Sequence, residues 1–198
     1  MSKRETHLIL LGGRNIDQQQ WIREVEKELS SYFKATHVLD YQHWKRGTVV
    51  EDVLTEAENL TALVDSIGQE TDYAIFAKSM GTLVAAEAIK QRRISPYFCM
   101  FAGTPITSPF PHGDNVRRRI EHLFRNYQTP TLFLQNLDEK FMEAGELEDT
   151  LELLGVKNFE VAPGGGKIHQ YSVDKICGAM FYLALLATER DGIFAISN

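Results

Sequence analysis

The sequence is poor in cysteine, in net positive charge and in long apolar runs, and each shortage excludes a class of protein. Two cysteines, Cys99 and Cys177, are too few for a disulfide framework. The net charge of -6 argues against a nucleic-acid-binding surface, which is usually strongly basic. The longest apolar run, residues 176–187, is about half of the roughly 20 residues that span a bilayer, so no membrane span is expected.

These absences predict a cytoplasmic protein. Both cysteines lie in apolar sequence, which suits buried thiols in a reducing compartment. The N-terminal "MSKRETHLILLGG" has only a short apolar run and no small-residue cleavage site, which is typical of a strand and not of a signal peptide. Ordinary globular composition and the lack of any linker-like stretch favour one domain over residues 1–198.

What the sequence contains is an alternation of short apolar runs with helical patterns. The apolar runs are continuous, which is typical of strands buried on both faces of a parallel sheet. Repeated strand-helix units imply an α/β fold, and we expect a three-layer α/β/α sandwich with a mostly parallel sheet of about six strands. The predicted strands cover residues 7–11, 36–41, 73–77, 97–102, 131–135 and 159–162.

In such sheets the functional site lies beyond the carboxyl ends of the strands. The loops that follow the predicted strands therefore share one rim, and we expect the opposite rim to be structural. The loops on the functional rim cover residues 12–15, 41–47, 78–81, 103–115, 136–143 and 163–171.

The segment "IFAKSMGT" places Ser79 between a predicted strand and a predicted helix. A serine at such a turn is exposed above the sheet as a nucleophile when the residues two before and two after it are small. Ala77 and Gly81 meet that condition, although the usual motif has glycine at the first position. The alternative is a serine that only caps the following helix.

A general base for Ser79 would be a histidine further along the chain, because the hydrolase order is Ser, then Asp or Glu, then His. His169 follows the last predicted strand and could reach back over the sheet to the serine. His112, in the loop after the fourth strand, is the alternative, and His122 lies inside a predicted helix.

The acid that orients this base is expected just after the strand at residues 131–135. Asp138 is the first carboxylate there, and Asp is the commoner residue for orienting an imidazole. Glu139 and Glu143 are its competitors.

An oxyanion site needs backbone N–H donors close to the nucleophile. Met80 directly follows Ser79, and the loop "LLGGRN" offers the N–H of Arg14 after Gly12 and Gly13. The glycine pair could instead make a tight turn or hold a phosphate, but the G-x-G-x-x-G pattern is absent.

Together, "LILLGGRN", "IFAKSMGT", "LFLQNLDEKF" and "GGGKIHQYS" resemble the α/β-hydrolase superfamily, and small dienelactone-hydrolase-like members most of all. The resemblance implies an eight-stranded sheet, of which this chain would be a minimal form without a cap domain. It also implies nucleophilic catalysis by Ser79, His169 and Asp138, with Met80 and Arg14 as oxyanion donors and no metal or organic cofactor.

The substrate predicted from this reading is a small-molecule ester or thioester. Gly13, His43, Trp44 and Phe110 are the expected pocket residues, because they lie in loops on the functional rim. An inactive hydrolase-like binding protein and a nucleotide-binding or transferase domain are the alternatives. The sequence leaves both monomer and homodimer open.

Overall fold

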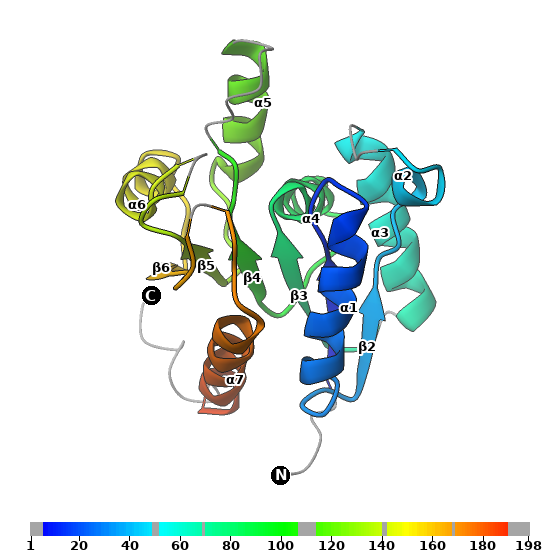
Figure 1. Ribbon diagram of the computed structural model, residues 1–198. Helices are drawn as coiled ribbons and strands as arrows, with labels where there is room; N and C mark the ends of the chain where they lie inside the picture. Colours follow the sequence, from blue (N-terminus) through cyan, green and yellow to red (C-terminus); the bar gives the residue numbers. More distant parts are fainter. Residues whose placement is uncertain are drawn as a thin grey trace.

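Figure 1 shows the computed structural model, which describes residues 6–48, 52–68, 70–106, 114–139, 142–167 and 169–189. Its six strands form one parallel sheet in the order β2-β1-β3-β4-β5-β6. The predicted α/β class and strand number are therefore confirmed. The strands are β1 (His7–Leu11), β2 (Ala35–Val38), β3 (Tyr73–Lys78), β4 (Cys99–Ala102), β5 (Thr131–Gln135) and β6 (Phe159–Pro163).

Helices cover both faces of the sheet and complete the three layers (Figure 1). Helices α1 and α7 contact each other on one face, while α4 contacts both α3 and α5 on the other. No helix in the described ranges is long and apolar enough to cross a bilayer. The helices are α1 (Asp17–Leu29), α2 (Gln42–Lys45), α3 (Val53–Ile67), α4 (Met80–Lys90), α5 (Asp114–Phe124), α6 (Ala144–Leu153) and α7 (Val173–Glu189).

The centre of the sheet explains why the strand sequences are continuous and apolar. Strand β1 lies between β2 and β3, and every residue of β3 is buried. Helices on both faces remove both sets of alternating side chains from water, so neither set needs to be polar. In register, Leu11 pairs with Ala77, so β1 and β3 end at nearly the same level at one rim of the sheet.

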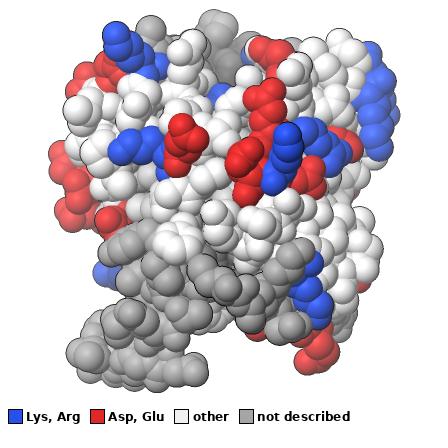
Figure 2. All heavy atoms as spheres, turned by 60° about the horizontal axis from the view of Figure 1, so that its bottom comes forward, with Lys and Arg blue, Asp and Glu red and all other residues white. Residues whose placement is uncertain are grey.

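The carboxyl ends of the strands form one rim of the sheet, and the amino ends form the opposite rim. The strand ends that lead into α4, α2 and α5 point upward in Figure 1. Figure 2 turns the opposite rim toward the viewer, and there basic and acidic side chains are interspersed, with neither sign dominating.

Candidate active site

Ser79 lies at the elbow between β3 and α4 in a backbone conformation that serine rarely adopts. Its φ of 52° and ψ of -120° fall outside the regions favoured by L-residues. Such a conformation costs on the order of 1–3 kcal/mol and persists only where the surroundings enforce it. The Ser79 N–H donates to the carbonyl of Ala102 at 2.8 Å, and its carbonyl accepts from the Thr82 N–H at 2.9 Å. Ser79 is therefore held from both sides, and its side chain is half-buried.

Gly81, two residues after Ser79, is required by close packing. A β-carbon built at Gly81 would lie 2.6 Å from the carbonyl oxygen of Gly12 and 3.0 Å from the β-carbon of Leu11. Ala77 is completely buried in the sheet. The turn therefore brings the start of α4 against the end of β1, which is where the predicted oxyanion loop begins.

His169 lies over the carboxyl end of β4, next to the residue that holds Ser79. A β-carbon at Gly103 would be 2.7 Å from Cε1 and 3.0 Å from Nδ1 of the His169 ring. Gly103 has a φ of +63° and follows Ala102, whose carbonyl accepts the Ser79 N–H. Ser79 and His169 therefore contact two adjacent residues, Ala102 and Gly103, at the carboxyl end of β4.

The carboxylate that contacts His169 is Glu139, whereas Asp138 was the expected partner. Glu139 Oε1 lies 2.9 Å from His169 Nδ1, and the Glu139 side chain is completely buried. Asp138 is exposed on the same turn. The turn is closed by the Glu139 N–H donating to the Asn136 carbonyl at 3.3 Å, and this bend directs the longer side chain inward.

Tyr171 holds the other oxygen of Glu139. Its hydroxyl donates to Glu139 Oε2 at 2.8 Å in a buried contact. Burial, together with the charge of Glu139, raises the pKa of Tyr171, so the phenol remains a donor at neutral pH. Each oxygen of the carboxylate therefore has a partner, the half-buried ring of His169 on Oε1 and the buried hydroxyl of Tyr171 on Oε2.

Asn136 fixes the loop that carries His169. Its Oδ1 accepts the Gly166 N–H at 3.1 Å, and its Nδ2 donates to the Gln170 carbonyl at 3.0 Å. Asn136 itself is buried. The loops after β5 and β6 are thus joined by contacts of the Asn136 side chain. An amide directly after a strand was the only sequence signal available for this role.

The predicted oxyanion loop is held by aromatic residues that follow β2. The Tyr41 hydroxyl donates to the Gly12 carbonyl at 3.0 Å, and Trp44 Nε1 donates to the Arg14 carbonyl at 3.4 Å. A β-carbon at Gly12 would lie 2.7 Å from the Trp44 ring, so this glycine is needed for close approach. Trp44 is buried, and it packs edge-on against Tyr41. Its indole therefore contacts both this loop and Tyr41.

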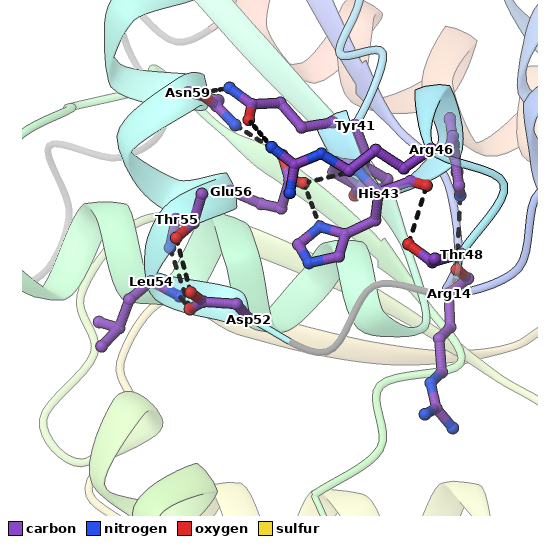
Figure 3. A network of polar contacts seen from close by, with 12 residues as sticks. Arg14, Tyr41, His43, Arg46, Thr48, Asp52, Leu54, Thr55, Glu56 and Asn59 are labelled. Atoms are coloured by element: carbon purple, nitrogen blue, oxygen red, sulfur yellow. Dashed lines mark hydrogen bonds and ion pairs between the residues drawn. The ribbon is translucent and has the colours of Figure 1, made fainter.

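His43, another expected pocket residue, is paired with a buried carboxylate. Figure 3 shows its ring directed at Glu56. The Nδ1 atom lies 2.5 Å from Glu56 Oε1. Glu56 is completely buried, and its Oε2 accepts from Asn59 at 2.8 Å. The pair joins α2 to α3, whose first turn is capped by Asp52. The Arg14 side chain points away from this network (Figure 3).

The remaining predicted site residues are Met80, Gly13 and Phe110. Met80 is the first residue of α4 and is buried, so its N–H is among the helix-starting donors that lack an intrahelical acceptor. Gly13 lies against the side chain of Gln18. Phe110, like the alternative base His112, lies outside the described residues. Within the described ranges, no group of three or more His, Cys, Asp or Glu side chains could hold a metal ion.

No protein-family model matches the sequence, and no curated protein sequence matches it. Solved structures do match in fold. Est1E from Butyrivibrio proteoclasticus, solved with ferulic acid, has a TM-score of 0.69 at 18% identity, and the match covers 93% of this chain and 91% of that one.

Further esterase structures match over similar lengths. A cold-adapted esterase from an Arctic intertidal metagenomic library gives a TM-score of 0.60 at 15% identity, covering 93% of this chain and 83% of that chain. An esterase from Pyrococcus furiosus gives 0.60 at 13% identity, covering 93% and 81%. The chain therefore has the α/β-hydrolase fold, as the sequence motifs predicted.

Proposed function

We propose that the protein is a serine hydrolase that cleaves a carboxylic ester or thioester of a small molecule. The proposal is carried by the strained Ser79 elbow, whose N–H is bound to Ala102, together with the His169 ring that lies against the next residue, Gly103. The Nδ1 of that ring contacts buried Glu139. Strain of this kind at a strand-to-helix turn exposes a nucleophilic hydroxyl. The esterase neighbours support the same reaction class.

In the proposed mechanism, His169 is the general base. Its Nδ1 is occupied by Glu139, so Nε2 takes the proton as Ser79 Oγ attacks the carbonyl carbon. Glu139 fixes the imidazole tautomer and stabilises the imidazolium that forms. His169 then returns the proton to the leaving alcohol or thiol, and water cleaves the acyl-enzyme by the reverse sequence of proton transfers. Glu139 replaces Asp138 in this role because it makes the contact to the ring.

The negative charge on the substrate oxygen would be stabilised by the N–H groups of Met80 and Arg14. Met80 starts α4, where unpaired N–H groups and the helix dipole favour an anion. Arg14 belongs to the loop that Tyr41 and Trp44 hold against the elbow. Gly13 and Trp44 form part of the pocket wall in this proposal. His43 is assigned to the support of α2 and α3, because its ring is bound to Glu56.

Hydrolysis of 4-nitrophenyl acetate by wild type and variants tests the proposal. We expect Ser79→Ala and His169→Ala each to lower kcat by about 1,000-fold or more. The nucleophile and its base act as one unit, so the loss of either one removes most of the rate enhancement. Glu139→Gln should lower kcat by about 100-fold or more, through loss of the tautomer that its charge fixes. Asp138→Asn is the matched control and should stay within about threefold of wild type, as an exposed side chain.

Two results would contradict the proposal. Turnover by Ser79→Ala equal to that of wild type would show that Ser79 is not the nucleophile, and would favour a binding role for the protein. A larger loss of kcat in Asp138→Asn than in Glu139→Gln would show that Asp138, and not Glu139, is the acid that orients His169. Circular dichroism of each variant establishes that the comparison is made between folded proteins.

A further inference from the structure

Lys78 is a buried cation next to the proposed nucleophile, and the mechanism above gives it no part. It is 6% exposed and is the last residue of β3, directly before Ser79. Removing an ammonium group from water is costly unless polar partners replace the lost solvation. A buried lysine at this position therefore needs a structural or chemical reason.

The side chain of Lys78 points to the face of the sheet covered by α1. Phe76, two residues earlier on β3 and so on the same face, contacts Trp21 of α1. The ammonium of Lys78 donates to Gln18 Oε1 at 2.6 Å and lies 4.9 Å from the centroid of the Trp21 ring. Gln18 and Trp21 are three residues apart on α1, so they share one helix face and can hold the same cation.

Gln18 connects this cation to the predicted oxyanion loop. A β-carbon at Gly13 would lie 3.1 Å from Gln18 Cγ and 3.3 Å from Gln18 Oε1, so the Gln18 side chain packs directly on the loop. The Gln18 N–H also donates to the Asn15 carbonyl at 3.0 Å, which joins the loop to the first turn of α1.

The two proposed oxyanion donors lie on either side of this contact. Met80 belongs to the elbow two residues after Lys78, and Arg14 follows Gly13, on which Gln18 packs. A shift between elbow and loop would separate the two N–H groups, and such donors stabilise an oxyanion only at about 2.7–3.1 Å from it.

We propose that Lys78 and Gln18 are positioning residues that fix the oxyanion loop against the nucleophile elbow. This inference rests on the proposed hydrolase function. A fixed distance between the two donors matters for the transition state more than for the bound ester, so its loss should change kcat and leave KM nearly unchanged.

The test compares Lys78→Met, Gln18→Ala and the double variant in hydrolysis of 4-nitrophenyl acetate. Methionine fills the space of the lysine stem without charge, and Gln18→Ala keeps the lysine but removes its acceptor. Loss of one oxyanion donor costs about 100- to 1,000-fold, so a displaced donor should lower kcat by about 10- to 100-fold with KM within about threefold. The double variant should be no slower than the slower single variant, because both changes break the same contact.

Lys90→Met is the matched control. Lys90 also donates to an oxygen, the Arg125 carbonyl at 2.7 Å, but it lies at the far end of α4. The Lys90→Met variant should therefore keep the kcat of wild type. Thermal unfolding of all variants separates a change in kcat from a loss of folded protein.

The outcomes distinguish this inference from the proposed function. Absence of wild-type hydrolysis that depends on Ser79 contradicts the proposed function. An active wild type with Lys78→Met and Gln18→Ala both within twofold of it overturns only the positioning role. A loss confined to Lys78→Met also overturns it, since the role requires Gln18 to transmit the contact.

Discussion

At the scale of single residues, the site depends on buried polar groups that are each held by a second group. His169 is oriented by Glu139, and Glu139 is bound by Tyr171. A buried carboxylate that loses one donor retains the desolvation cost without the compensating bond. The Tyr171 hydroxyl therefore stabilises both the fold and the proposed base.

Tyr171→Phe tests this arrangement. Removal of the hydroxyl should lower the free energy of unfolding by about 1–3 kcal/mol, because Glu139 Oε2 loses a buried donor. The same variant should lower kcat, since the carboxylate that orients His169 is less firmly held. The measurements are urea unfolding at pH 7 and ester hydrolysis. Tyr32→Phe, which changes an exposed tyrosine, is the control, and an equal effect of the two changes would contradict the account.

The residues around the base also show where sequence reasoning stops. The order serine, carboxylate, histidine placed Ser79 and His169 in the loops where the structure has them. The choice between Asp138 and Glu139 could not be made from sequence, because the turn from Asn136 to Glu139 decides which side chain is directed inward. The Asn136 and Tyr171 contacts depend on the same loop conformation.

At the scale of elements, the central feature is the approach of α4 to the end of β1. Gly81 allows this approach, because its missing β-carbon would contact the Gly12 backbone. Helix α2 supports the same loop from the other side through Trp44. The sequence predicted the elbow because small residues at fixed spacing leave a pattern, but it did not predict α2. A helix of four residues is too short to show an apolar period.

Gly81→Ala should therefore destabilise the protein, although alanine favours helices. The added carbon would lie 2.6 Å from a backbone oxygen, so α4 or β1 must shift, at a cost of about 1–3 kcal/mol. Gly145→Ala on α6 is the matched control, because nothing lies within 4 Å of its added carbon, and it should stabilise by about 0.4–1 kcal/mol. Urea unfolding of both variants measures the difference. A Gly81→Ala protein at least as stable as wild type would contradict the close-packed elbow.

At the scale of the whole molecule, the sheet and its helices could be predicted, because apolar runs of five residues separated by helical periods specify buried parallel strands. Strands β1 and β5 have the predicted bounds, while β2 ends three residues earlier than expected. Strand β2 is at the edge of the sheet, where pairing on one side only leaves its end less defined by neighbours.

The histidine pair at this edge is expected to make the stability of the fold depend on pH. His37 on β2 lies 3.0 Å from His7 on β1, between Nε2 and Nδ1, and the rings are stacked. Burial, and then the neighbouring His7, lower the pKa of His37 below 6.5. Below pH 6.5 the unfolded chain therefore binds more protons at His37 than the folded chain does. The contribution of His37 to the free energy of unfolding is present above pH 6.5 and is lost as the pH falls.

We expect wild type to lose more stability between pH 8 and pH 5.5 than His37→Thr does. Threonine suits a strand and cannot be protonated. Urea unfolding of both proteins at the two pH values gives the comparison, in which the remaining carboxylates and histidines contribute almost equally. Equal losses in the two proteins would show that the histidine pair does not contribute to acid destabilisation.

The central claim, that Ser79 is an activated nucleophile, is tested most directly by covalent labelling. A fluorophosphonate probe reacts with a serine that is deprotonated by a base and faces an oxyanion site. Mass spectrometry of the digested protein should find the adduct on the peptide containing Ser79. The adduct should be lost in Ser79→Ala and formed much more slowly in His169→Ala. An unlabelled wild-type protein, or an adduct on another residue that persists in Ser79→Ala, would contradict the account.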